Sequence, residues 1–143
     1  MHTLQPVLKR GLNSWDKINM PVSEFEERVA RIRALMGKEN IDVLLLYSND
    51  LDNYGAQSYI SNFRMETIGG TIIAIPAKGK VALIFEGGPR LIPLVQTLTW
   101  IDELKTGNNV AEVLVKYLSD NNFIPSTIGL AGLNHLMPYE EWN

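Results

Sequence analysis

The first strong pattern in the chain is an amphipathic helix that begins after Pro21. Its apolar positions recur at intervals of four, three and four residues, which places them on one face of a helix: Phe25, Val29, Ile32 and Met36. Ser23 and Glu26 have the spacing of a capping box, in which each side chain bonds to the other residue's backbone N–H. Gly37 is suited to the left-handed residue that ends a helix.

An almost unbroken apolar run follows, from Ile41 to Tyr47. Such a run is typical of a strand covered on both faces, so we predict that it is the buried centre of an α/β sheet. The run ends in polar residues, namely Ser48, Asn49, Asp50, Asp52 and Asn53. Open α/β sheets usually bind ligands at the carboxyl ends of their strands, so this loop is the first candidate site.

The middle of the chain predicts a hairpin. Residues 54–63 form a short helix or turn, and the apolar stretch 71–75 forms the next strand. The turn 77–80 contains Gly79 and leads into the apolar stretch 81–85. Strands joined by so short a loop are antiparallel, and the sheet is therefore mixed.

Later signals are two helix starts and two further strands. Pro89 is placed for the first position of a short helix, and residues 100–104 are a plausible strand. Asn108 or Asn109 caps a second helix, whose inner positions are Val110, Leu114, Tyr117 and Leu118. Pro125 stops that helix, and the small-residue apolar stretch 127–133 predicts a closely buried strand.

The two ends of the chain differ from its middle. Residues 1–21 lack periodicity, and we interpret them as an irregular leader with a weak docking point at Trp15 and Ile18. Residues 22–143 form the domain. The stretch 137–142 has the pattern of a first helical turn, so we expect the natural chain to continue past Asn143.

Composition narrows the function classes. The 143 residues are 45% hydrophobic and 20% charged, as in ordinary globular proteins. Thirteen basic against 16 acidic residues give a net charge of −3, which disfavours a nucleic-acid partner. The absence of cysteine excludes disulfides and thiolate zinc sites and suits a reducing cytoplasm. Neither a signal peptide nor a membrane-spanning stretch is evident, so we expect a cytoplasmic protein without a membrane partner.

Candidate chemistry is sparse. The two histidines, His2 and His135, have no partner at metal-ligand spacing. Asp50 and Asp52 could bind a hard cation, but aspartates more often cap turns in such loops. No nucleophile motif or phosphate-binding glycine fingerprint is present. We therefore predict neither a catalytic residue nor a metal site in this chain.

A polar cluster remains around the loop after the first strand. Its hydrogen-bonding members are Asp50, Asp52, Asn53, Tyr59, Arg64 and Glu66. Such a cluster beside an aromatic ring can contact a small polar ligand. Residue chemistry alone favours the alternative, an ordinary hydrogen-bonded surface loop.

The order of these segments resembles a known family. The helix has the form F-x-x-R-x-x-x-(I/L)-R-x-x-M, and a buried I-D-V-L-L-L strand, a Y-(L/I)-(T/S)-G-F-like signature at 59–63 and a hairpin follow it. Together they resemble the N-terminal domain of the creatinase and Xaa-Pro peptidase family (prolidase, aminopeptidase P). Asn62 stands where that family usually has glycine, and asparagine tolerates the left-handed backbone next best.

The resemblance implies a ribonuclease-H-like α/β fold with a mixed β-sheet flanked by helices. It implies a domain without catalytic residues, since the family's two-metal centre, with Asp, His and Glu ligands, belongs to a following pita-bread domain. It also implies a homodimer, in which the loop after the first strand borders the active site of a neighbouring subunit. On that basis Asn53, Tyr59, Arg64 and Glu66 are candidate substrate-binding residues.

The leading hypothesis is therefore a non-catalytic N-terminal domain of a metal-dependent Xaa-Pro dipeptidase or aminopeptidase. The divalent metal, Mn, Co or Zn, and most contacts to a small peptide or amide substrate would belong to the missing catalytic domain. Two alternatives stay open. The parent protein is a creatinase-like small-amide hydrolase, or the chain is a stand-alone binding or dimerisation module.

Overall fold

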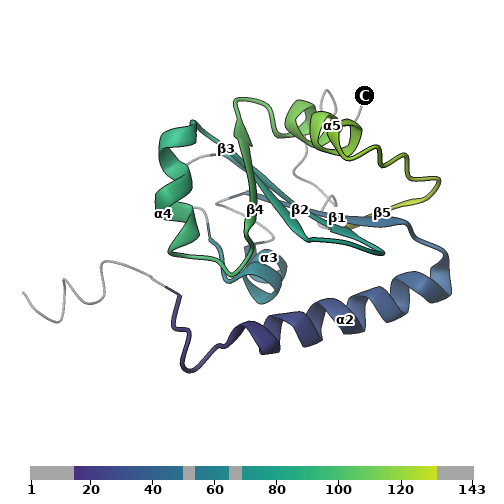
Figure 1. Ribbon diagram of the computed structural model, residues 1–143, viewed down its shortest axis with the longest axis horizontal. Helices are drawn as coiled ribbons and strands as arrows, with labels where there is room; N and C mark the ends of the chain where they lie inside the picture. The colour runs from purple at the N-terminus through teal and green to yellow at the C-terminus, as the bar shows by residue number, and fades with distance from the viewer. Residues whose placement is uncertain (1–14, 50–53, 65–68, 132–143) are drawn as a thin grey trace, which may run out of the picture.

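A mixed sheet forms the centre of the molecule (Figure 1). The computed structural model describes residues 15–49, 54–64 and 69–131, and within them five strands pair in the order β4-β3-β2-β1-β5. The strands are β1 Val43–Asn49, β2 Gly70–Pro76, β3 Ala82–Glu86, β4 Glu103–Gly107 and β5 Ile128–Ala131. β2 is antiparallel to both neighbours, whereas β4 and β5 run parallel to β3 and β1. The predicted mixed α/β sheet and its hairpin are confirmed.

Helices cover both faces of the sheet. On one side lie α2 (Val22–Glu39) and α3 (Tyr54–Ser61), and on the other lies α5 (Val110–Asp120), as Figure 1 shows. A short helical connection, η1 (Pro89–Leu91) and α4 (Ile92–Gln96), links β3 to β4. Pro89 begins that connection, as predicted. None of the helices in the described ranges is long and apolar enough to cross a membrane.

The alternation of side chains along the strands builds two apolar layers. Leu46, Ile73 and Phe85 face α2 and α3, where they pack with Val29 and Met36 of α2. The alternate positions pack against α5: Val43, Tyr47, Ile72, Ala74 and Ile84. The predicted inner face of α5 is confirmed, and Asn109 is its cap, because its Oδ1 accepts bonds from the N–H groups of residues 111 and 112.

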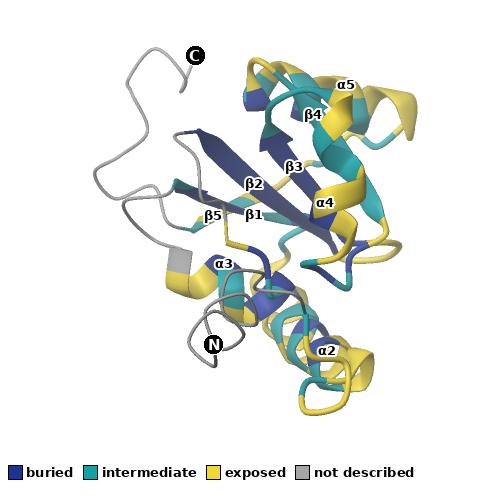
Figure 2. Ribbon diagram, turned by 90° about the vertical axis from the view of Figure 1, so that its left-hand side faces the viewer, coloured by how far each residue is buried: buried dark blue, intermediate teal, exposed yellow. Residues whose placement is uncertain are grey.

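The central strand is β2, and not β1 as the apolar run predicted. Every residue of β2 is buried, and Figure 2 shows it as the dark blue middle of the sheet. β1 begins at Val43 and is second from the edge, with Leu44 and Leu45 only partly buried. The prediction was wrong because an apolar run reports burial, whereas the position of a strand depends on which distant segments pair with it.

Two details of α2 also differ from the prediction. The helix begins at Val22, so Ser23 lies inside its first turn and no side chain caps the end. The helix continues through Gly37 to Glu39, and Asn40 takes the left-handed conformation (φ 55°) that ends it. Asparagine adopts this backbone more readily than other residues with a side chain, so the cap does not need glycine.

The strand predicted at 100–104 is displaced to Glu103–Gly107. The residues before it are bound to α3, since Thr99 Oγ1 donates to the carbonyl of Ser61 (2.6 Å) and Trp100 Nε1 donates to that of Ile60 (2.7 Å). Pairing with β3 therefore begins only at Glu103.

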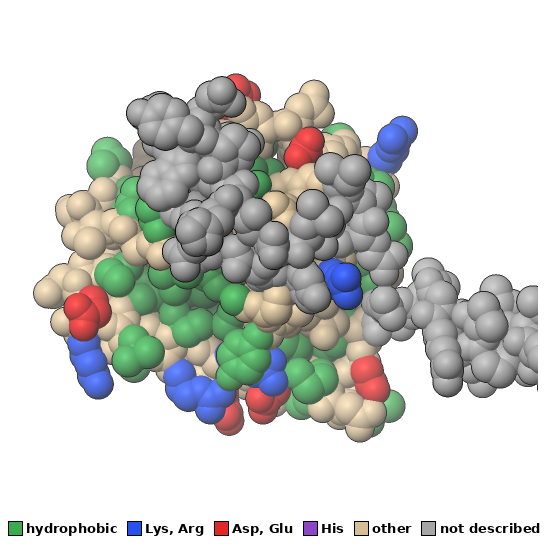
Figure 3. Space-filling view, turned by 180° about the vertical axis from the view of Figure 1, so that it is seen from behind, with side chains coloured by type: hydrophobic (Ala, Val, Ile, Leu, Met, Phe, Trp, Pro, Cys, Tyr) green, Lys and Arg blue, Asp and Glu red, His purple; other side chains and the backbone are tan. Residues whose placement is uncertain are grey.

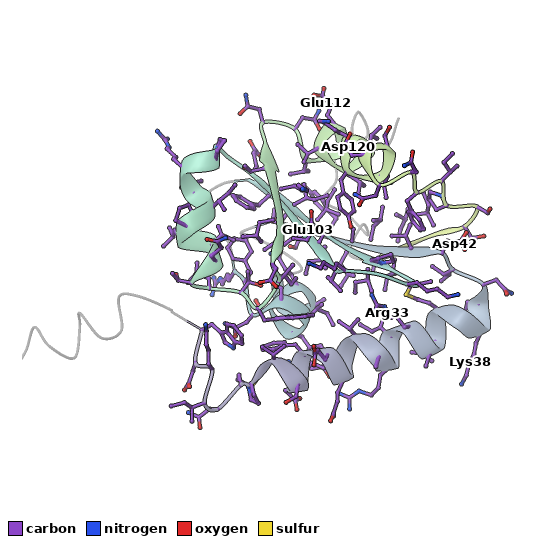
Figure 4. The ribbon with its side chains drawn as sticks, in the orientation of Figure 1. Arg33, Lys38, Asp42, Glu103, Glu112 and Asp120 are labelled. Carbon is purple, nitrogen blue, oxygen red and sulfur yellow. The ribbon has the colours of Figure 1, made fainter. Side chains whose placement is uncertain are left out.

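The last strand is an edge strand and is not closely buried throughout. Ile128 and Leu130 of β5 are 47% and 53% exposed. Gly129 is closely packed, because an added Cβ would lie 3.1 Å from the side chains of Ile41 and Leu44, and Ala131 packs against the core. Asp42 supports the strand start, because its Oδ2 accepts bonds from two N–H groups at 126 and 127 (Figure 4). Residues 132–143, with His135 and the helical turn predicted at 137–142, lie outside the described residues.

The segment before α2 packs against the domain through Trp15. Its backbone N–H donates to Thr97 (3.0 Å), and its ring meets Phe25 edge-on at 6.2 Å. Phe25 in turn stacks on Trp100 at 5.9 Å. Ile18 is 89% exposed, so it is not part of the predicted docking point, which Trp15 alone provides.

The end of α3 confirms the left-handed backbone predicted at Asn62. Its φ is 60°, and its Nδ2 donates to the carbonyl of Leu98 at 3.0 Å. This one side chain therefore permits the turn and also joins α3 to the segment after α4.

We predict that Asn62→Ala lowers the free energy of unfolding by about 2 kcal/mol, because it adds left-handed strain and removes a hydrogen bond. Asn62→Gly should cost about 1 kcal/mol or less, since glycine accepts this backbone freely. Asn122→Ala is the matched control, because Asn122 (φ 50°) has no side-chain bond to the described residues. Urea unfolding measures all three, and equal losses for the two alanine variants would contradict a role for the Leu98 bond.

Candidate functional site

The carboxyl ends of most strands lie together along one edge of the sheet. Because β1, β3, β4 and β5 run in the same direction, their carboxyl ends meet there, beside the amino end of β2. α3 follows β1 and packs against it, so both border this edge. This is the location where open α/β sheets bind ligands.

The structure describes two of the four predicted substrate-binding residues. Tyr59 lies on α3 and is 52% exposed, and Arg64 lies three residues after the end of α3 and is exposed. Asn53 and Glu66 lie outside the described residues, as do Asp50 and Asp52. Arg64 lies in the connection from α3 to β2, and the contact of Tyr59 and Arg64 with a substrate stays a prediction.

One face of the Tyr59 ring is already occupied. The guanidinium carbon of Arg28, on α2, lies 4.2 Å from the ring centroid, and Arg28 Nη1 donates to the Tyr59 carbonyl at 2.6 Å. Glu24 holds the guanidinium through bonds of 3.1 and 2.9 Å from Nε and Nη2 to its Oε1. Arg28 therefore joins α2 to α3, and the Tyr59 hydroxyl and outer ring face remain for other contacts. The sequence motif contained Arg28, but its spacing did not reveal this partner.

Two buried polar atoms at this edge have no hydrogen-bond partner in the described structure: Ser48 Oγ on β1 and Gln57 Nε2 on α3. The two residues are only 1% and 2% exposed. Ser48 pairs with Thr71 across the strands and lies on the same face of β1 as Leu46, which is the face that α2 and α3 cover. Both residues therefore place unpaired polar groups between the sheet and α3.

Neighbouring polar residues in the same layer are fully bonded. Ser61 Oγ donates to the Gln57 carbonyl at 2.8 Å and accepts from the Phe63 N–H at 3.0 Å. A buried polar group without a partner costs about 1–3 kcal/mol, so native proteins contain few. A hydroxyl and an amide N–H can both donate to an oxygen atom. The pair can thus bind a carbonyl or carboxylate oxygen, or an ordered water molecule.

The same edge contains one carboxylate that is already engaged. Glu86, at the end of β3, accepts a bond from the Gly70 N–H at 3.0 Å through Oε2. Across the described residues, no group of three or more His, Cys, Asp or Glu side chains is arranged to hold a metal ion. The chemistry that this edge can perform is hydrogen bonding to a polar ligand.

Sequence reasoning missed Gln57, although a signal was present. Gln57, Ile60 and Ser61 have the i, i+3, i+4 spacing of one helix face, and all three are buried. A glutamine on the buried face of a short helix is unusual enough to be a candidate. Ser48 was noted only as part of the polar loop, because its burial depends on α3.

We predict that Ser48→Ala leaves the free energy of unfolding unchanged or raises it by about 1–2 kcal/mol, since it removes a buried hydroxyl without a partner. Ser61→Ala, equally buried but bonded twice, should lower it by about 1–3 kcal/mol. Urea unfolding followed by circular dichroism compares them. An equal loss for both variants would show that the Ser48 hydroxyl is bonded in solution and would contradict the assignment.

Comparison with known proteins identifies the fold. No family model and no curated protein matches the sequence. Among solved structures, the Xaa-Pro dipeptidase from Bacillus anthracis matches with a TM-score of 0.60 and 18% identity, over 82% of this chain and 29% of that chain. An Xaa-Pro aminopeptidase from Streptococcus pyogenes matches at 0.57 and 16% identity, over 76% of this chain and 74% of that one. The N-terminal domain of an Xaa-Pro dipeptidase from Lactobacillus brevis matches at 0.56 and 8% identity, over 72% and 75%.

These matches confirm the resemblance at the level of the fold. The chain has the α/β fold of the N-terminal domains of Xaa-Pro dipeptidases and aminopeptidases. It spans less than a third of the length of the Bacillus anthracis dipeptidase.

Proposed function

We propose that this chain is the non-catalytic N-terminal domain of a metal-dependent hydrolase that acts on Xaa-Pro peptides, as a dipeptidase or an aminopeptidase. The observation that carries the proposal is the structural match to the Bacillus anthracis Xaa-Pro dipeptidase, over 82% of this chain but only 29% of that protein. The helix, buried strand and hairpin occur in the order that the sequence motifs of this family have.

The reaction is proposed to take place outside this chain. The described residues do not fit a catalytic metal, because they provide no group of three ligands. The sequence adds only two histidines and no cysteine. We therefore assign the divalent ion, Mn, Co or Zn, to a catalytic domain that follows residues 22–143 in the parent protein.

The proposed contribution of this domain is to form a homodimer and to border the active site of the neighbouring subunit. The loop region 48–66 would do so, with Asn53, Tyr59, Arg64 and Glu66 as its substrate contacts. The half-exposed Tyr59 and the exposed Arg64 support this role, as do the unpaired donors of Ser48 and Gln57 at the same edge. A peptide or small amide substrate offers the carbonyl oxygens that such donors bind. We also propose a cytoplasmic location, on the absence of cysteine.

We expect the 143-residue chain to be inert in a peptidase assay with manganese, because residues 15–49, 54–64 and 69–131 contain no group of three metal ligands. The intact gene product should cleave a dipeptide that ends in proline. Release of proline by the 143-residue chain would contradict the proposal. Cleavage of creatine in place of Xaa-Pro dipeptides would select the creatinase-like alternative, and a gene that ends at Asn143 would select the stand-alone module.

A second test concerns the substrate contacts. Arg64→Ala and Tyr59→Ala should each raise the KM of the parent enzyme by roughly fivefold to tenfold, the effect of one lost contact. For Tyr59→Ala the free energy of unfolding should change by about 1 kcal/mol or less, since the Arg28–Tyr59 ring contact is the main loss at this half-exposed position. Tyr59→Phe keeps that contact and isolates the hydroxyl.

Lys116→Ala is the control, since Lys116 lies on the outer surface of α5, on the other face of the sheet. An unchanged KM together with a large loss of thermal stability would show that Tyr59 and Arg64 are structural residues.

A further inference from the structure

Large apolar side chains lie in the open at the β5 edge of the sheet. They are Leu45 on β1 and Ile128 and Leu130 on β5, which together are called the β5 patch below. Ile128 and Leu130 are 47% and 53% exposed, and Leu45 is partly buried. Figure 2 shows β5 in the colours of intermediate and exposed residues, whereas β2 is buried along its whole length.

The pairing of β5 with β1 sets the face on which these side chains lie. Leu130 pairs with Leu45, and Leu45 packs in the apolar layer under α5, with Tyr47 and Ile72. Paired residues on adjacent strands share a face of the sheet, and so do residues two apart on one strand. Ile128 and Leu130 therefore point to the face of α5. That helix packs mainly on β4, β3 and β2, so it leaves the β5 patch uncovered.

The other face of β5 is already filled. Gly129 lies there against the side chains of Ile41 and Leu44, and Ala131 packs against the core. β5 thus has small residues on its covered face and large apolar residues on its open face. A strand with one face in water usually has polar residues on that face, whereas strands paired in parallel are usually covered on both faces. The residues of β5 therefore indicate that another segment covers the β5 patch.

The opposite edge strand, β4, shows how an edge that meets water is built. On the face of α5 it carries Glu103 and Lys105, since these pair with Ala82 and Ile84 of the same apolar layer. Lys105 Nζ and Glu103 Oε1 form an ion pair of 2.7 Å. Charged residues are a common protection of an exposed edge strand. β5 has no charged residue at all.

The segment best placed to cover the patch is the chain that follows β5. Residues 132–143 continue directly from Ala131 and are therefore tethered at the patch. Their apolar members are Leu133, Leu136, Met137, Tyr139 and Trp142. In the helical turn predicted at 137–142, Tyr139 and Trp142 are three positions apart and share one face. A short tether gives an effective concentration of about millimolar, whereas a second copy of the chain loses translational freedom when it binds.

We propose that residues 132–143 cover the β5 patch, with Tyr139 and Trp142 against Ile128 and Leu130. The segment completes the apolar layer that α5 begins on this face of the sheet. This inference concerns the 143-residue chain alone and does not depend on the proposed peptidase parent.

The test measures how fast a single introduced thiol reacts, since the chain has no cysteine of its own. Leu130→Cys places the thiol in the patch. Leu35→Cys is the matched control, because Leu35 is 60% exposed and lies on α2, on the other side of the sheet (Figure 1). Each rate with a disulfide reagent is divided by the rate of the same variant unfolded in urea. Leu130→Cys should react at least about tenfold more slowly than Leu35→Cys, because a covered site must open before it reacts.

Two further substitutions in the Leu130→Cys chain, Tyr139→Ser and Trp142→Ser, should restore the rate to that of Leu35→Cys. Circular dichroism verifies that each variant is folded. Equal rates for Leu130→Cys and Leu35→Cys would overturn the proposal. A slow reaction that persists after the two serine substitutions would also overturn it. A reaction that slows further as the protein concentration rises would do the same, because it would identify a second copy as the cover.

Discussion

The complete burial of β2 is the constraint on which the rest of the structure depends. Gly70–Pro76 is hydrogen-bonded on both edges and covered on both faces. Its alternate side chains need two separate apolar layers, one from α2 and α3 and the other from α5. A central strand satisfies all its backbone groups within the sheet, so each surrounding element serves to keep water away from it.

The directions of the strands then determine at which edge of the sheet the polar groups lie. Since β2 alone runs against the other strands, four carboxyl ends meet at one edge and leave the β2–β3 turn at the other. The candidate site of Ser48 and Gln57 lies at the first edge. Seen from behind, hydrophobic side chains gather in the middle of the molecule, next to atoms that are not described (Figure 3).

Buried polar residues divide into two kinds in this layer. Ser61 Oγ donates within α3, to the Gln57 carbonyl, and Thr99 Oγ1 donates to the Ser61 carbonyl, which joins α3 to the segment before β4. Ser48 Oγ and Gln57 Nε2 make no such bond in the described structure. An unpaired group opposes folding, whereas a paired group is roughly neutral or favourable. The contrast between neighbours of equal burial is the reason that this edge is the candidate site, since a requirement of the fold alone would favour apolar residues at both positions.

The sequence by itself determined the features that depend on neighbouring residues. The apolar stripe of α2, the hairpin, an asparagine cap at 108 or 109 and the left-handed Asn62 follow from local periodicity and backbone preference, and the order of motifs indicated the fold. Only the tertiary structure decided that β2 is central, that β4 begins at Glu103, and that Arg28 covers Tyr59. It also left the buried polar atoms of Ser48 and Gln57 without a hydrogen-bond partner among the described residues. Those features depend on pairing between segments far apart in the chain, which a local pattern does not encode.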